Sequence, residues 1–130
     1  MNDDVVSDYC LAIKEKTKLG DFVGALGIAD RLVYAYPNSE KGYYFRAICY
    51  YGMQRYEESV INYKMALKIN PLDAKAYFNL GTSYQQIKQY DLALINFGKA
   101  LILFSKQGKQ DAKNKCIDAL NIIDRERPRQ

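Results

Sequence analysis

Tyrosine recurs at a fixed interval of 34 residues in this chain, at Tyr9, Tyr43 and Tyr77. The same interval relates four further sets of positions, which are Phe22, Tyr56 and Tyr90; Ala25, Ser59 and Ala93; Leu32, Ala66 and Ala100; and Pro37, Pro71 and Ser105. A period of roughly 20–50 residues indicates one supersecondary unit copied along the chain. Because such a unit cannot bury its apolar face alone, we expect the copies to stack into a solenoid whose surface serves binding.

Residues 74–104 show the repeated unit most clearly. Apolar and small residues follow helical spacing in two segments, the first with Tyr77, Leu80, Gly81 and Tyr84 and the second with Tyr90, Ala93, Leu94, Phe97, Ala100 and Leu101. Asp73 can cap the first helix, and the polar residues Lys88 and Gln89 separate the two. Because Gly81 and Ala93 are small where two antiparallel helices would cross, the pattern predicts a closely packed helical hairpin.

These residues resemble the tetratricopeptide repeat, a family of 34-residue helical hairpins. The family pattern of Trp-x-x-Leu-Gly-x-x-Tyr followed by Ala-x-x-x-Phe is matched by Tyr77-x-x-Leu80-Gly81-x-x-Tyr84 and by Ala93-x-x-x-Phe97. The chain departs from the pattern by using tyrosine for tryptophan, by Arg46 at a leucine position, and by Ser105 for the third proline.

The resemblance implies an all-α fold in a single domain over residues 1–130. We expect a right-handed α-solenoid of three helix-turn-helix hairpins, with repeats at about 6–39, 40–73 and 74–107. A further apolar stripe follows, formed by Ala112, Cys116, Ile117, Ala119, Leu120, Ile122 and Ile123. It predicts a C-terminal capping helix at about 110–125, followed by a frayed tail at 126–130.

Composition and missing residue types argue against catalysis. The chain has no histidine, no Gly-rich phosphate loop and no cysteine beside a plausible base, so we expect no enzyme activity, no cofactor and no catalytic residue. Cys10, Cys49 and Cys116 lie far apart, which excludes the usual spacing of zinc ligands, and we predict no metal site. Three buried free thiols would suit the reducing cytoplasm. We expect no secretory leader, because the acidic N-terminal residues are followed by no continuous apolar segment.

The charge pattern bears on possible partners. The net charge of +4 is modest and the basic residues are dispersed, which favours a solvated surface over a nucleic-acid site. No apolar run approaches the roughly 18 residues of a membrane span. We therefore expect a protein partner, with neither nucleic acid nor membrane.

In the family that the chain resembles, the first helices of successive hairpins line a concave groove that holds a peptide. The corresponding positions in the first repeat are Ser7, Cys10, Leu11, Lys14 and Thr17. The second repeat contributes Lys41, Tyr44, Phe45, Ile48 and Tyr51. The third contributes Lys75, Phe78, Asn79, Thr82, Gln85 and Gln86. These positions predict the peptide groove.

Tyr44 and Tyr51 do not occupy the positions that define the repeat. They lie seven residues apart, with Ile48 between them, on a helix whose core residues face another way. Such surplus aromatics can form a binding hot spot. The alternative is that they pack against a neighbouring helix of the same chain. Lys41 and Lys75 on the same face could pair with acidic groups of a ligand, or could simply be solvated.

Some relatives in this family bind the C-terminal carboxylate of cytosolic chaperones through a clamp of lysine, asparagine and arginine. Here the clamp positions are Cys10, Lys14, Phe45, Lys75 and Asn79, of which only Lys75 matches. Several donors must converge on one carboxylate in that mode. We therefore expect a ligand with apolar or aromatic anchors and acidic flanks instead of a chaperone tail.

The leading hypothesis is a non-enzymatic interaction module, an adaptor or scaffold that holds a peptide or helix in its groove. One alternative is a secretion-type chaperone for a hydrophobic client, because bacterial type III translocator chaperones look similar. Those chaperones tend to be acidic, and this chain is basic. The other alternative is a scaffold that self-assembles through its end helices.

Overall fold

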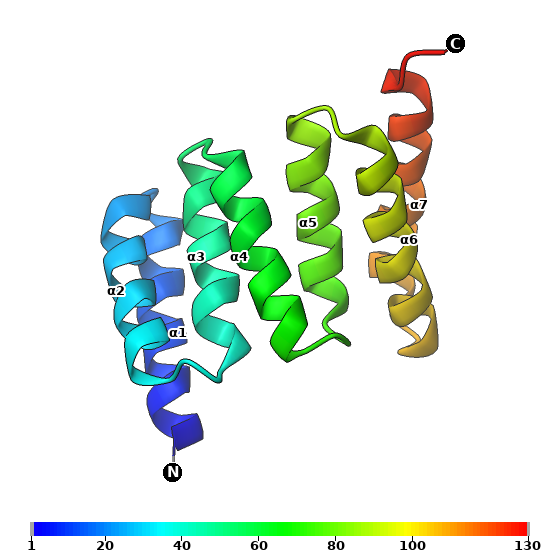
Figure 1. The fold of residues 1–130 in the computed structure, drawn as a ribbon. Helices are drawn as coiled ribbons and strands as arrows, with labels where there is room; N and C mark the ends of the chain where they lie inside the picture. Colours follow the sequence, from blue (N-terminus) through cyan, green and yellow to red (C-terminus); the bar gives the residue numbers. More distant parts are fainter. Residues whose placement is uncertain (1, 130) are drawn as a thin grey trace. The chain divides into compact units, whose positions relative to one another are not determined.

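The computed structural model describes residues 2–129, which form seven α-helices and contain no strand (Figure 1). The prediction of an all-α helical repeat is confirmed. The helices are α1 (Asn2–Lys18), α2 (Phe22–Ala35), α3 (Glu40–Gly52), α4 (Tyr56–Ile69), α5 (Ala74–Gln86), α6 (Tyr90–Lys106) and α7 (Gln110–Glu126).

The chain divides into two compact units, which we call the N-terminal unit (Met1–Pro71) and the C-terminal unit (Leu72–Gln130). In the N-terminal unit each helix from α1 to α4 packs on the next, and α1 also contacts α3. In the C-terminal unit α6 packs on both α5 and α7 (Figure 1). Each unit therefore has its own helix–helix core.

The turn inside each hairpin repeats with the sequence. Gly20, Gln54 and Lys88, spaced by 34 residues, all have positive φ angles, of 74°, 61° and 62° respectively. A left-handed residue there reverses the chain between the two helices. Only Gly20 adopts this conformation without a penalty from a Cβ atom. The backbone thus repeats even where the residue type does not.

The predicted close crossing in the third hairpin is confirmed. A Cβ atom built on Gly81 would lie 2.9 Å from ring atoms of Phe97. In the preceding hairpin the same two positions hold Ala47 and Tyr63, both buried. The glycine therefore makes room for a ring that lies directly against the α5 backbone. The predicted cap also forms, because the Asp73 carboxylate accepts a hydrogen bond of 3.2 Å from the Ala76 amide.

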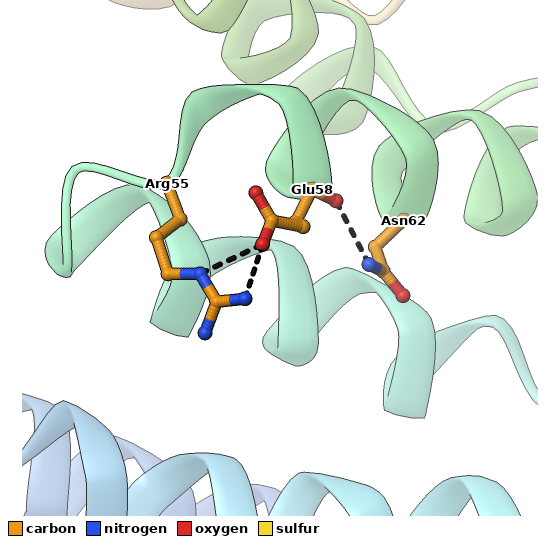
Figure 2. Close-up of polar contacts among 3 residues, drawn as sticks. All are labelled: Arg55, Glu58 and Asn62. Carbon is orange, nitrogen blue, oxygen red and sulfur yellow. Dashed lines mark hydrogen bonds and ion pairs between the residues drawn. The ribbon is translucent and has the colours of Figure 1, made fainter.

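Two buried asparagines occupy equivalent positions on the second helices of their hairpins. Asn62 and Asn96 are each 7% exposed, and their Nδ2 atoms donate hydrogen bonds of 2.8 Å to the carbonyls of Glu58 and Leu92. Figure 2 shows the first of these bonds, and beside it Arg55 Nε donates a hydrogen bond of 2.7 Å to the Glu58 carboxylate. Since each buried amide has a backbone acceptor one turn back, its burial is compensated.

Arg46 stands where the next repeat has the buried Leu80. Its Nε atom lies 3.3 Å from Asp30 Oδ1, and its guanidinium carbon lies 5.8 Å from the centre of the Tyr43 ring. The ion pair and the ring replace the apolar packing that leucine would supply. This departure from the family pattern thus links α3 to α2.

The C-terminal end differs from the prediction in one respect. Helix α7 continues to Glu126, and Arg127 then lies 3.2 Å from Asp91 and 3.5 Å from Asp124. Arg127 was expected in a frayed tail, but these ion pairs hold it against α6 and α7. Gln130, at the end of the predicted tail, lies outside the described residues.

Candidate functional site

The predicted groove residues of the N-terminal unit come from two helices. We call Lys14 of α1 together with Lys41, Tyr44, Phe45, Ile48 and Tyr51 of α3 the N-terminal row. Ser39 caps α3, with its Oγ atom accepting a hydrogen bond of 3.3 Å from the Lys41 amide. Because the α3 members are spaced at three or four residues, they share one side of the helix.

Two of the predicted first-helix positions are not available at the surface. Phe45 is 6% exposed and Cys10 is 8% exposed, and both belong to a core cluster with Ile13, Leu32 and Cys49. The expectation that Phe45 offers an apolar surface to a ligand therefore does not fit the structure. Its ring joins α3 to α1, because it packs in one cluster with Cys10 and Ile13 of α1.

Tyr44, Ile48 and Tyr51 are half-buried. The Tyr44 ring makes edge contacts with Phe45 and with Tyr63, at centroid distances of 5.3 and 5.9 Å. The Tyr51 ring meets Tyr56 at 5.2 Å. Both tyrosines thus pack against α4, which was the alternative interpretation of these residues. Each ring is also partly exposed, so the packed tyrosines still contribute aromatic surface to this side of α3.

Lys14 and Lys41 are exposed, and within the described residues neither forms an ion pair. Lys14 Nζ lies 5.9 Å from the centre of the Phe45 ring. Burial raises the pKa of the Cys10 thiol, and the charges of Lys41 and Lys14 oppose that rise. Both ammonium groups therefore lie near the same thiol, together with the Glu40 carboxylate, whose charge adds to the rise in the pKa.

The groove residues predicted for the C-terminal unit form what we call the C-terminal row: Lys75, Phe78, Asn79, Thr82, Gln85 and Gln86, all on α5. Lys75 and Gln86 are exposed, and the other four are half-buried. Phe78 packs against Phe97 at a centroid distance of 5.2 Å, and Thr82 Oγ1 donates a hydrogen bond of 3.1 Å to the Phe78 carbonyl. Amides and hydroxyls dominate what this row presents.

Helix α7 contacts the C-terminal row, which the sequence reasoning did not foresee. Gln85 Nε2 donates a hydrogen bond of 3.1 Å to Glu126 Oε2, and Phe78 packs against a cluster that includes Cys116. Exposed polar pairs so distant in sequence leave no periodic signal. Helix α7 therefore borders the row as well as covering the last hairpin.

The described residues offer little for catalysis. None of them forms a group of three or more histidine, cysteine or acidic side chains that could hold a metal ion. The three cysteines are free and buried, and burial raises the pKa of the Cys49 thiol to about 12, with a further contribution from Asp30. A thiol in that state is not a nucleophile at neutral pH. Among the described helices none is long and apolar enough to cross a membrane.

Comparison with known proteins identifies the family. A family model described as "TPR repeat" matches residues 49–88, and one described as "Tetratricopeptide repeat" matches residues 74–106. These matches assign the tetratricopeptide repeat to residues 49–106, and the hairpins, turns and glycine crossing described above agree with that assignment.

One curated relative is named "Uncharacterized protein ycf37", from Guillardia theta. It is 36% identical over 67 residues, a segment that covers 48% of this chain and 38% of the relative. The chain thus matches well under two thirds of that protein's length.

Two solved structures show the same fold at low identity. A complex of the TPR2B domain of yeast Sti1 with pHsp70 has a TM-score of 0.88 and 18% identity, and the match covers 94% of this chain and 98% of that one. The type III secretion chaperone SycD of Yersinia enterocolitica, in complex with a peptide of the translocator YopD, has a TM-score of 0.87 and 12% identity, with 96% of each chain covered. At these identities the likeness concerns the fold.

Proposed function

We propose that this chain is a non-enzymatic protein-interaction adaptor that binds a segment of a partner protein on the N-terminal row. The observation that carries the proposal is the combination of two unpaired lysines with three half-buried apolar or aromatic side chains on one side of α1 and α3. Such a surface fits a peptide or helix with aliphatic or aromatic anchors and an acidic flank. The Sti1 domain is in complex with pHsp70 and SycD is in complex with a peptide of the translocator YopD, which supports this use of the fold.

The side chains of the N-terminal row do not favour a ligand that binds mainly through its C-terminal carboxylate. Cys10 and Phe45 stand where the clamp of some relatives has donors, and both are buried and apolar. Two lysines remain near this point, fewer than the set of donors that such a clamp brings together. Side chains of the partner, more than its terminal carboxylate, therefore supply most of the recognition.

The proposal is tested by selecting ligands from a displayed library of random peptides and measuring their affinity by fluorescence anisotropy. We expect the selected peptides to combine aromatic or aliphatic residues with acidic ones. Replacing Tyr44, Ile48 and Tyr51 together by alanine should weaken binding by at least a factor on the order of a hundred, since the loss of a single hot-spot contribution of about 2 kcal/mol already weakens it about thirtyfold.

A second variant separates a loss of binding from a loss of folding, because it changes no packed side chain. Lys14→Glu with Lys41→Glu alters only exposed side chains and should weaken binding of the acidic peptides about tenfold, more at low salt. The matched control carries Thr82→Ala, Gln85→Ala and Gln86→Ala in the C-terminal row. Full affinity in both N-terminal variants, with unchanged helical circular dichroism, would refute the proposal.

A secretion-type chaperone remains the alternative, and the full-length match to SycD is what favours it. A chaperone should keep a hydrophobic client soluble on co-expression, whereas an adaptor should bind a short segment of an already folded protein. Light scattering tests self-assembly, which predicts a mass above that of one chain. The buried free thiols at Cys10, Cys49 and Cys116 support a reducing compartment such as the cytoplasm.

A further inference from the structure

Helix α6 carries an apolar stripe on its exposed side. Leu92, Ile95 and Ile102 are 41%, 52% and 56% exposed. Lys99 and Lys106, also exposed, continue the same spacing of three or four residues, so the five side chains share one face over about 21 Å. Single exposed aliphatic residues are common on protein surfaces. A row of them interspersed with lysines combines exposed aliphatic surface and positive charge on one helix face.

The net positive charge of the chain lies in the C-terminal unit, which carries this stripe. The N-terminal unit has nine basic and nine acidic residues, whereas the C-terminal unit has ten basic and six acidic ones. Lys109, in the turn that follows α6, and Lys113, one helical turn into α7, adjoin Lys106 in sequence. Within the described residues none of these lysines forms an ion pair.

The neighbouring acids only partly offset this charge. Asp91, at the start of α6, is already paired with Arg127 at 3.2 Å. Asp111 is the one acidic residue between Lys99 and Lys115. The surface therefore presents an excess of positive charge next to exposed aliphatic carbon.

We propose that this α6 surface, formed by Leu92, Ile95, Lys99, Ile102, Lys106 and Lys109, docks the protein on an anionic membrane surface. Lysines with long flexible stems can reach lipid headgroups while the aliphatic side chains between them enter the interface. From the sequence we expected no membrane partner, because no apolar run is long enough to span a bilayer. A peripheral contact needs no such segment.

Other anionic partners fit this surface less well. Nucleic acid binding to single strands relies on aromatic stacking and on arginine, and the α6 surface has neither. A peptide ligand favours a pocket for its anchors, whereas these side chains stand along one exposed helix face. The proposal is independent of the peptide function assigned to the N-terminal row.

The test is sedimentation of the full chain with phosphatidylcholine vesicles, with and without phosphatidylserine, at low and high salt. We expect binding only to the phosphatidylserine vesicles and a loss of binding as salt rises. Lys99→Glu, Lys106→Glu and Lys109→Glu together should weaken it by a factor on the order of a hundred, since each lysine near the surface contributes about fivefold.

The matched control reverses three exposed lysines of the N-terminal unit, Lys18→Glu, Lys64→Glu and Lys68→Glu, and should change vesicle binding only a few-fold. Ile95→Ser with Ile102→Ser should reduce the binding that persists at moderate salt. Equal losses in the two charge-reversal variants, or no binding to anionic vesicles, would overturn the proposal. So would preferential capture of soluble polyglutamate or of DNA, which would assign the surface to a different partner.

Discussion

The two units are built from the same repeat but present different chemistry. Their equivalent hairpins, α3 with α4 and α5 with α6, bury matching positions, Ala47 with Tyr63 in one unit and Gly81 with Phe97 in the other. The partly exposed positions diverge, from Tyr44, Ile48 and Tyr51 in the N-terminal row to amides and hydroxyls in the C-terminal row. The repeat thus constrains what packs between helices and leaves the outer row free to vary.

Charge separates the units in the same way. The N-terminal unit is balanced overall and has two unpaired lysines beside its aromatic row, whereas the excess positive charge of the chain lies in the C-terminal unit. We therefore propose that the N-terminal unit binds a peptide and that the C-terminal unit binds an anionic membrane surface. Three experiments test how far the two units differ in stability and in their turns.

The largest effect is expected at the helix crossing of the C-terminal unit. Phe97 is 1% exposed, and Phe97→Ala should lower the free energy of unfolding by about 3–5 kcal/mol through lost burial and a cavity against Gly81. Native-state hydrogen exchange should show the loss of protection mainly in α5 to α7. The matched variant Tyr63→Ala should act mainly in α1 to α4. Equal loss in all helices in both variants would show that the units unfold together.

An intermediate effect concerns the buried thiols at alkaline pH. Burial raises the pKa of Cys49 from its ordinary 9.0 to about 12. The unfolded thiol ionises first, so stability is complete below the unfolded pKa and falls as pH rises from 9.0 towards 12, by at most about 1.4 kcal/mol per pH unit.

Urea denaturation of the wild type and of Cys49→Ala across this pH range measures the free energy of unfolding of each protein. The decrease of this free energy with rising pH should be less steep in the variant. Cys116→Ala should reduce the slope less, because burial alone raises the pKa of Cys116, whereas Asp30 adds to it at Cys49. Identical slopes in all three proteins would show that the thiols do not titrate with unfolding.

The smallest effect is expected at the turns, and it should be the same in both units. Gln54→Gly and Lys88→Gly each relieve a left-handed backbone conformation and should stabilise the chain by about 1 kcal/mol. Gln54→Ala, the control, keeps the Cβ atom and should give no gain. A thermal melt of each variant measures this, and a gain in only one unit would show that the turns are not equivalent.

Much of the fold could be predicted because repeated burial leaves a repeated pattern. The 34-residue interval, the N-cap at Asp73 and the small Gly81 all depend on local helix geometry and on contacts between adjacent helices. The candidate site was less predictable. A register indicates which side of a helix a residue occupies, but it does not indicate how deeply a neighbouring helix covers that side. Phe45 and Cys10 were therefore placed in the groove although they are core residues.

The sequence alone determined the class of this protein, its helical hairpins and the helix faces available for recognition, because these follow from periodicity. Only the tertiary structure decided which members of those faces remain accessible. It also brought Glu126 to Gln85 and Arg127 to Asp91, and it placed Lys14 and Lys41 near the same buried thiol without an ion pair among the described residues. The physical reason is that such contacts join polar residues that are far apart in sequence. Neither hydrophobic spacing nor helix propensity predicts contacts of this kind.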